Sequence, residues 1–271
     1  MHLHLSPFWL RRTASAAIFA LAAITTGCVS LGGETVYTAP DGATASLGDV
    51  LTALDEQQDA LQTLQATRVS FILDTARSDA TFSGRGDVYY QRPDAMHVLA
   101  RHRTSGAIVL RMVVNGSDAA MAYGLGADRG EAVWRQGELV AGEPTPFTPW
   151  EVVHEVFQPE RWSSLPRNSV RVSQPYDPDS GEMVLTIGRS GMERRIVKIA
   201  GPPWRIVENY LLGPEGPVAK TTLMEHRQFD GVLVPTDIQA DFYGEPASLT
   251  IRLTRDPELN APVDNRLFRL E

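Results

Sequence analysis

The feature that most constrains this chain is a period-two alternation of apolar and polar residues, which recurs from about residue 68 to residue 254. In residues 232–242, for example, apolar valine, isoleucine, alanine and phenylalanine alternate with polar residues such as aspartate and glutamine. Successive side chains of a strand point to opposite faces of a sheet. The alternation therefore predicts strands with one buried and one solvated face, which is typical of antiparallel sheets.

Turn signals separate the alternating segments and support a meander. Asn115-Gly116 is a strong hairpin signal, and Arg92-Pro93-Asp94 and Ser105-Gly106 mark further turns. Because Pro235 cannot donate to a strand ladder, it suggests an edge or a bulge at that point. The predicted strands lie at about residues 69–74, 82–90, 96–101, 108–114, 119–123, 131–135, 170–174, 183–189, 194–199, 205–212, 217–228, 232–242 and 249–254.

Two segments have helical periodicity instead. In residues 47–66 leucine and valine recur on one face, with Ser46 as N-cap and Asp49 as capping-box partner. The second helix begins after Thr148, with a proline at its first position and Glu151 as capping-box partner. Apolar residues at 147 and 152 occupy its hydrophobic-staple positions, and Pro159 marks its end.

The fold class that follows is mainly β, of the α+β type: a curved antiparallel sheet or incomplete β-barrel covered by two or more helices. So many strands in one sheet tend to curl or to close toward a barrel. A curled sheet beneath helices leaves an apolar hollow on its concave side. Gly84 and Gly86 share a face with large apolar residues, and two interpretations stay open. The glycines either leave space in the hollow or only ease the curvature of a sheet whose interior is filled.

Residues that face the hollow are candidates for contact with a ligand. They are Phe82, Val88, Tyr90, Ile108, Leu110, Met112, Ile238, Phe242, Leu249 and Ile251. Most of them would belong to the core in any version of the fold.

The N-terminus carries the order of a secretory signal. A basic region with Arg11 and Arg12 precedes an apolar run, small residues and Cys28, which is the only cysteine of the chain. The ending Ile-Thr-Thr-Gly-Cys resembles the lipobox of bacterial lipoproteins. The resemblance implies cleavage of residues 1–27 and a diacylglycerol on the thiol of Cys28; the alternative is a plain signal peptide with an incidental cysteine.

A lipid anchor would place the protein in the bacterial cell envelope. Position 29 is valine, whereas an aspartate after the cysteine usually retains proteobacterial lipoproteins in the inner membrane, so the resemblance favours an outer-membrane destination facing the periplasm. Residues 28–45 are rich in glycine, threonine and alanine and lack any periodicity, which predicts a flexible tether. Residues 46–271 then form the folded domain.

Three stretches of that domain resemble the LolA/LolB-like family of outer-membrane lipoprotein carriers and receptors. They are the strand and turn from Phe82 to Pro93, the segment from Phe229 to Pro235 and the ending from Asn260 to Phe268. The order of these motifs also matches that family. The resemblance implies an incomplete barrel that holds acyl chains in an apolar cavity, and Cys28 would make this chain similar in topology to the receptor.

Composition and motifs argue against several other classes. The formal net charge of -8 and the lack of a Lys/Arg cluster disfavour nucleic-acid binding. A single cysteine excludes a disulfide within the chain and a cysteine-based zinc site. His154-Glu155 begins like a zinc-protease helix, but Gln158 stands where the second histidine is needed. We therefore expect no metal, no cofactor and no catalytic residue.

The leading hypothesis is a non-enzymatic, membrane-anchored envelope lipoprotein that binds a lipid or a lipoprotein acyl chain and takes part in lipid or lipoprotein trafficking. The second is a tethered envelope scaffold or assembly factor with a filled core and an unidentified protein partner. A secreted hydrolase is a third; loss of activity on changing His154 or Ser190 would support it.

Overall fold

The computed structural model describes residues 36–38, 44–75, 80–126, 129–145, 147–157, 161–189, 192–244 and 246–270. All of them fall within one unit of the chain, Glu34–Glu271. The predicted signal segment 1–27, Cys28, Pro159 and Ser190 lie outside the described residues.

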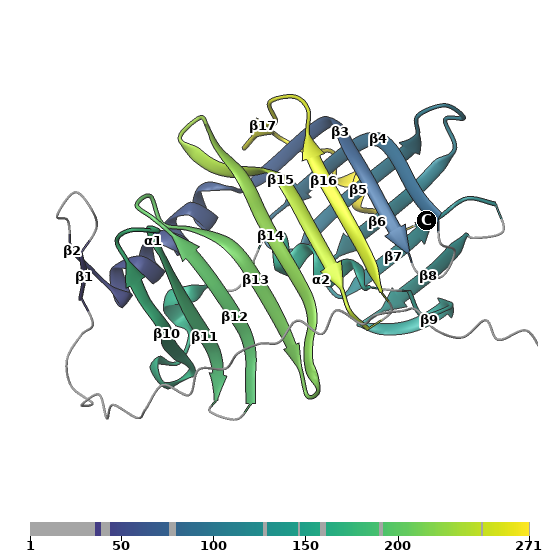
Figure 1. The fold of residues 1–271 in the computed structure, drawn as a ribbon. Coiled ribbons are helices and arrows are strands. Elements are labelled where there is room, and N and C mark those ends of the chain that lie inside the picture. Colours follow the sequence, from purple (N-terminus) through teal and green to yellow (C-terminus); the bar gives the residue numbers. More distant parts are fainter. Residues whose placement is uncertain are drawn as a thin grey trace, which may run out of the picture. The chain divides into compact units, whose positions relative to one another are not determined.

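One 15-stranded antiparallel sheet dominates the structure, and its order confirms the predicted curved sheet covered by helices (Figure 1). Its strands lie in the order β10-β11-β12-β13-β14-β15-β16-β3-β4-β5-β6-β7-β8-β9, and β17 also pairs with β3. Their bounds are β3 Thr63–Thr75, β4 Ala80–Gln91, β5 Ala95–His102, β6 Ile108–Asn115, β7 Asp118–Tyr123, β8 Gly130–Arg135, β9 Glu138–Gly142, β10 Val170–Asp177, β11 Glu182–Arg189, β12 Met192–Ala200, β13 Arg205–Gly213, β14 Gly216–Phe229, β15 Val232–Phe242, β16 Ala247–Leu253 and β17 Glu258–Leu259.

The sheet is a pair of meanders joined in the middle. Strands β3 to β9 follow one another, as do β10 to β16, and the last strand of the second run pairs with the first strand of the other, with Ile251 opposite Phe71. Consequently β9 and β10 form opposite edges of the sheet although they are neighbours in sequence. The segment between them must cross from one edge to the other, and it carries helix α2 (Pro149–Val156).

Local backbone features bend the sheet. A β-bulge interrupts β3 between Ala66 and Val69, where Arg68 has a positive φ of 61°. In β4, a Cβ on Gly86 would fall 1.6 Å from the carbonyl oxygen of Leu99. A Cβ on Gly84 would fall 2.7 Å from the carbonyl oxygen of Arg101. The backbone of β5 thus fills the space that the missing side chains leave, which favours the curvature interpretation of these glycines over the interpretation that they open the hollow.

The two predicted helices are present on the concave side of the sheet. Helix α1 (Leu47–Ala60) has the predicted capping box, since Asp49 accepts from the Ser46 amide at 2.9 Å and the Ser46 hydroxyl accepts from the Asp49 amide at 3.2 Å. The prediction that α1 continues to residue 66 is wrong, because Leu64 belongs to β3. The capping box of α2, formed by Thr148 and Glu151, is confirmed.

Short elements complete the unit. Strands β1 (Val36–Thr38) and β2 (Thr44–Ser46) pair with each other in a part of the chain that the sequence predicts to be irregular. Single-turn 3-10 helices lie at Trp162–Ser164, Arg167–Ser169 and Asn265–Phe268. The last of these packs on β5 and β6, where Phe268 is buried, so the end of the chain covers the outer side of those strands.

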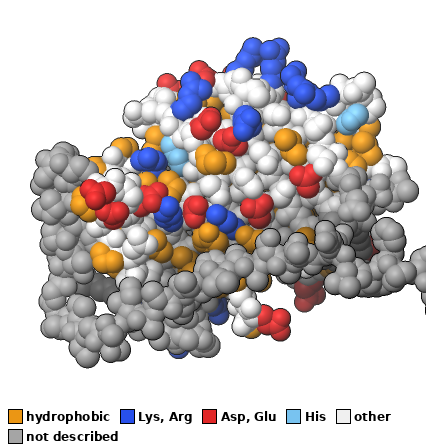
Figure 2. Space-filling model, viewed as in Figure 1, with side chains coloured by type: hydrophobic (Ala, Val, Ile, Leu, Met, Phe, Trp, Pro, Cys, Tyr) orange, Lys and Arg blue, Asp and Glu red, His pale blue; other side chains and the backbone are white. Residues whose placement is uncertain are grey.

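Alternation along the strands separates a continuous apolar interior from a polar outer surface. Strand β15 shows it clearly: Val232, Val234, Ile238, Ala240 and Phe242 are all buried. On the face seen in Figure 2, which β13 to β16 cross, acidic and basic side chains are interspersed. Lys220 and Glu208 form an ion pair of 3.3 Å across two of these strands. One side of the sheet therefore faces water and the other faces the helices.

Candidate functional site

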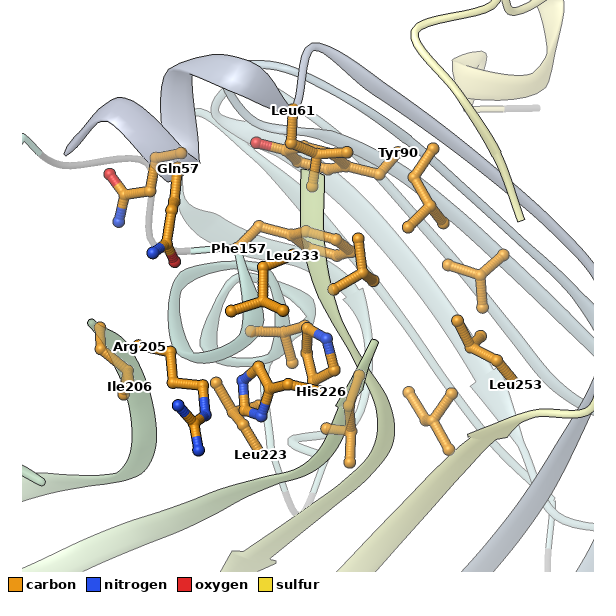
Figure 3. A pocket seen from close by; sticks show the side chains of 18 of the residues that line it. Gln57, Leu61, Tyr90, Phe157, Arg205, Ile206, Leu223, His226, Leu233 and Leu253 are labelled. Atoms are coloured by element: carbon orange, nitrogen blue, oxygen red, sulfur yellow. The ribbon is translucent and has the colours of Figure 1, made fainter. Parts of the chain in front are cut away.

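An apolar cavity of about 120 Å³ lies between the concave face of the sheet and the two helices (Figure 3). Its walls come from α1, α2, the segment just after each helix and seven strands of the sheet. The lining residues are Leu54, Gln57, Gln58, Leu61, Leu64, Val88, Tyr90, Met96, Val98, Val152, Val156, Phe157, Arg205, Ile206, Leu223, His226, Leu233, Val234, Pro235, Ile238, Ile251 and Leu253. A dry apolar cavity of about 150 Å³ in another protein accepts benzene, so this volume suits roughly six carbon atoms.

A pair of stacked rings limits the volume. Phe157, directly after α2, stacks on Tyr90 of β4 with ring centroids 3.9 Å apart and an interplanar angle of 3°. The Tyr90 hydroxyl donates to the carbonyl oxygen of Pro93 at 3.0 Å, which fixes that ring. Burial raises the pKa of Tyr90 to about 12, so its hydroxyl stays protonated at neutral pH. The ring of Phe157 lines the cavity from the helical side, and the ring of Tyr90 lines it from the sheet.

Polar side chains gather where the cavity meets the surface. Four residues line both the cavity and an open groove on the outside of β11 to β15, and they form the mouth of the cavity: Arg205, Leu223, His226 and Leu233. Figure 3 shows the guanidinium of Arg205 and the ring of His226 on the same side of the cavity. The Gln57 amide of α1 donates to the carbonyl oxygen of Trp204, which ties the helix to this mouth.

The charge at the mouth resides on Arg205. Burial and the neighbouring guanidinium of Arg205 lower the pKa of His226 to about 4, against an opposing hydrogen bond to the backbone of Ile206. The imidazole is therefore neutral at pH 7. Arg205 Nη1 donates to the carbonyl oxygen of Pro203 at 3.1 Å. Within the described part of the chain, no carboxylate lies within ion-pair distance of this guanidinium.

Helix α2 is held by a buried polar cluster as well as by apolar contacts. Glu155, which is 1% exposed, accepts from Arg195 of β12 at 3.1 Å and from the side-chain amide of Asn209 of β13. Burial raises the pKa of Glu155, and the charge of Arg195 opposes that shift. At its other end, Trp150 Nε1 donates to the carbonyl oxygen of Gly116 at 2.8 Å. Both ends of α2 are thus attached to the sheet.

The acid Asp55 attaches α1 in a similar way. Its carboxylate is buried and accepts from the backbone amides of Trp162 at 2.6 Å and Ser163 at 3.0 Å. Those residues belong to the segment that connects α2 with β10. Helix α1 is therefore bonded to the segment that follows α2, and α2 to side chains of the sheet.

The candidate residues from the sequence fall into three groups. Val88, Tyr90, Ile238 and Ile251 line the cavity. Five others are buried in the same apolar core but lie outside the lining: Phe82, Leu110, Met112, Phe242 and Leu249.

Ile108 forms the third group, and its predicted inward orientation is wrong. A register shift between β5 and β6 makes Arg101 pair with Ile108 directly after Ala100 pairs with Leu110. Val109 is the extra residue, so the alternation reverses there and the Ile108 side chain is 43% exposed.

Sequence reasoning missed the contribution of the helices and of β3, β5, β13 and β14 to the lining. Val152, Val156 and Phe157 were recognisable as an apolar helical face, but nothing in that pattern assigns them to a cavity. Arg205 and His226 carry no motif. They come together only through the pairing of strands, as β13 pairs with β14.

The described residues contain no group of three or more histidine, cysteine, aspartate or glutamate side chains that could hold a metal ion. Among those same residues, none of the helices is both long enough and apolar enough to span a bilayer.

Comparison with solved structures identifies the class of fold. A curved antiparallel sheet with two helices on its concave side is the LolA-like open barrel, which confirms the family resemblance at the level of the fold. No protein-family model matches the sequence, and no curated protein matches it.

Two of the similar structures define this likeness. One is a LolA superfamily protein from Nitrosomonas europaea, with a TM-score of 0.50, 11% identity and coverage of 82% of this chain and 96% of that one. The other is a DUF1329 family protein from Desulfovibrio piger ATCC 29098, with a TM-score of 0.50, 9% identity and coverage of 82% and 95%. At this identity the likeness concerns the fold alone.

Proposed function

We propose that this protein is a non-enzymatic lipoprotein of the bacterial cell envelope that holds an acyl chain in the cavity beneath α1 and α2. The observation that carries the proposal is the apolar cavity itself, enclosed by the helices on the concave side of a LolA-like sheet. Most of its lining is aliphatic or aromatic, and burial of apolar surface drives association with hydrocarbon.

The volume of the cavity limits the affinity for a hydrocarbon chain. About six buried methylenes would contribute about 5 kcal/mol before the cost of association. That corresponds to binding no tighter than about the high micromolar range. A longer chain needs the cavity to widen, and displacement of Phe157 would widen it, because its ring lines the cavity from the helical side and is held there by its stack on Tyr90.

Anchoring at the membrane belongs to the same proposal. Cys28 would carry a diacylglycerol after removal of residues 1–27 and hold the domain at the outer membrane, facing the periplasm. The sequence Ile-Thr-Thr-Gly-Cys and the valine at position 29 support this placement. Two long acyl chains on one cysteine suffice for stable anchoring. Metabolic labelling with an alkyne palmitate should modify the wild-type chain and leave Cys28→Ser unlabelled.

The test of ligand binding uses the full chain purified from its host membrane. Because binding this weak does not survive purification, the chain is first equilibrated with free fatty acid above its Kd; after rapid removal of unbound lipid, organic extraction and mass spectrometry should release a lipid bound at a fixed ratio to protein. In Leu253→Trp, where a larger side chain is placed at the cavity wall, the amount should fall about tenfold. Leu211→Trp is the matched control, because Leu211 is a half-buried leucine outside the lining.

A filled-core scaffold is the competing function, and the stacked rings of Tyr90 and Phe157 favour it. If the wild-type chain, Leu253→Trp and Leu211→Trp all release equal, sub-stoichiometric lipid, the cavity holds no ligand. The proposal is then wrong, and a search for a protein partner becomes the appropriate next step.

A further inference from the structure

We infer that the ligand of the cavity is a single-chain lipid with an anionic headgroup, held by Arg205 at the cavity mouth, and not a lipoprotein with several acyl chains. This inference rests on the proposed function and names the class of ligand. Two independent observations support it: the charge balance at the mouth and the volume behind it.

The first observation is that, among the described residues, Arg205 has no acidic partner at this mouth. Two acids of the adjoining groove are already paired, Glu182 with Lys198 at 2.7 Å and Glu208 with Lys220 at 3.3 Å. The remaining acid, Glu225, is exposed, and within the described part of the chain it forms no ion pair with Arg205; Arg252 nearby is paired with Asp237. The hydrogen bond of Arg205 to the carbonyl oxygen of Pro203 uses one of the five N–H donors of a guanidinium.

The surroundings of Arg205 suit an anion. The guanidinium is half-buried beside apolar Leu223 and Leu233, where charge-assisted hydrogen bonds are stronger than in water. A carboxylate at this point would be at the surface end of the cavity, and its hydrocarbon chain would follow the apolar lining inward. A neutral headgroup would leave the guanidinium without compensation.

Gln58 adds a second polar group to the wall. Its side-chain oxygen Oε1 is buried, and no hydrogen-bond partner for it lies among the described residues. The two ends of an amide are exchanged by a rotation of 180°, so the same side chain can present N–H donors to a polar group in the cavity instead. A buried polar atom without a partner in a mostly apolar wall is consistent with a ligand that carries such a group.

The second observation is the size of the interior. A cavity of about 120 Å³ accepts one short hydrocarbon segment. Three acyl chains of a mature lipoprotein would require several times this volume, and the covers are bonded at both ends of α2 and at Asp55. A single short chain beside Arg205 fits the open volume, and only a longer one requires Phe157 to move.

The experiment uses the full chain in phospholipid nanodiscs and two photoreactive probes. One probe is a ten-carbon fatty acid with a diazirine near its methyl end, and the other is the corresponding ten-carbon alcohol. Mass spectrometry locates the cross-linked peptides, and titration gives the half-saturating concentration of each probe. We expect the acid to label cavity-lining peptides at a concentration at least tenfold below the alcohol.

Variants then test the role of Arg205. Arg205→Gln should abolish the preference for the acid without changing labelling by the alcohol, and Arg205→Lys should retain part of it. Arg135→Gln is the matched control, since it removes the same charge from an exposed ion pair with Asp118 that lies outside the cavity lining. Thermal unfolding of each variant in the same nanodiscs shows whether it is folded.

The outcomes distinguish a failure of the headgroup inference from a failure of the proposed function. Equal labelling of the cavity by acid and alcohol, unaffected by Arg205→Gln, would overturn the headgroup inference and leave the proposed function intact. An absence of labelling in the cavity by either probe would overturn both. Competition by a synthetic triacylated lipopeptide at the same concentration as the free fatty acid would overturn the single-chain assignment.

Discussion

Replacing Phe157 by alanine should weaken the fold and strengthen ligand binding at the same time. Replacing a fully buried phenylalanine by alanine lowers the free energy of unfolding by about 3–5 kcal/mol. Phe157 is half-buried, so we expect a loss of about 2 kcal/mol, including its stack on Tyr90. For a domain of this size that loss lowers Tm by roughly 4–8 °C. Calorimetry of the purified chain measures it.

The space vacated by the ring should admit two or three further methylenes. At about 0.8 kcal/mol each, they add about 2 kcal/mol, or roughly thirtyfold in affinity. The gain should appear for ten-carbon and longer chains and be absent for a six-carbon chain that already fits. Photoreactive probes of increasing length measure this dependence.

Phe229→Ala provides the control, because Phe229 is also half-buried against the core but lies outside the cavity. It should lower Tm without changing the chain-length profile. If Phe157→Ala lowers Tm and its affinity for the ten-carbon probe stays at the wild-type value, the ring does not limit the cavity and the reasoning fails.

Three further substitutions test the fold and the mouth. Gly86→Ala should lower the free energy of unfolding by more than about 3 kcal/mol or prevent folding, because its Cβ would overlap the Leu99 carbonyl. Gly244→Ala is the control: the space around Gly244 is open, so chemical denaturation should give the wild-type free energy of unfolding. Glu155→Gln should destabilise by about 3 kcal/mol and expose the α2 region in hydrogen exchange, because it leaves Arg195 without its partner; unchanged protection would refute this role. His226 has a folded pKa of about 4, below its ordinary value of 6.5, so its contribution to stability is complete above pH 6.5 and is lost as pH falls toward 4. Since the ring is partly accessible, screening reduces that contribution to about 1–2 kcal/mol. The free energy of unfolding should therefore differ less between pH 7 and pH 4.5 in His226→Gln than in the wild-type chain.

The sheet was predictable because burial on one face imposes a pattern on each strand. The predicted segment 232–242 coincides with β15. Capping signals located the start of both helices for a similar reason, since Ser46 and Thr148 satisfy amide groups that a helix leaves free. These signals are local, so the sequence alone reveals them.

The errors arise where a residue fits two patterns or where the structure departs from regularity without a local signal. Leu61 and Leu64 continue the helical spacing of α1, but Leu64 also fits the alternation of β3, and pairing with Tyr90 of β4 decides in favour of the strand. The bulge at Val109 has no sequence signature, so the exposure of Ile108 could not be predicted. Strand β9 was missed because all its residues are exposed and lack alternation.

The cavity mouth was beyond sequence reasoning because it depends on register. Arg205 begins β13, and His226 lies near the end of β14, directly after Glu225, which has a positive φ of 50°. Their meeting requires the pairing of these strands and the placement of α1 by the bond from Gln57 to Trp204. No periodicity in either strand distinguishes these two residues from the polar residues around them.

The strand order explains why a cavity can exist and change size in this fold. Because β9 and β10 form opposite edges, the segment that joins them crosses the concave side and carries α2 across it. This segment is attached by side-chain bonds such as those of Trp150 and Glu155, so its movement breaks no strand ladder. The hydrogen bonds of the sheet and the capacity of the cavity are therefore separate quantities. Substitutions at Phe157 can alter capacity at modest cost in stability, whereas those at Gly86 act on the sheet itself.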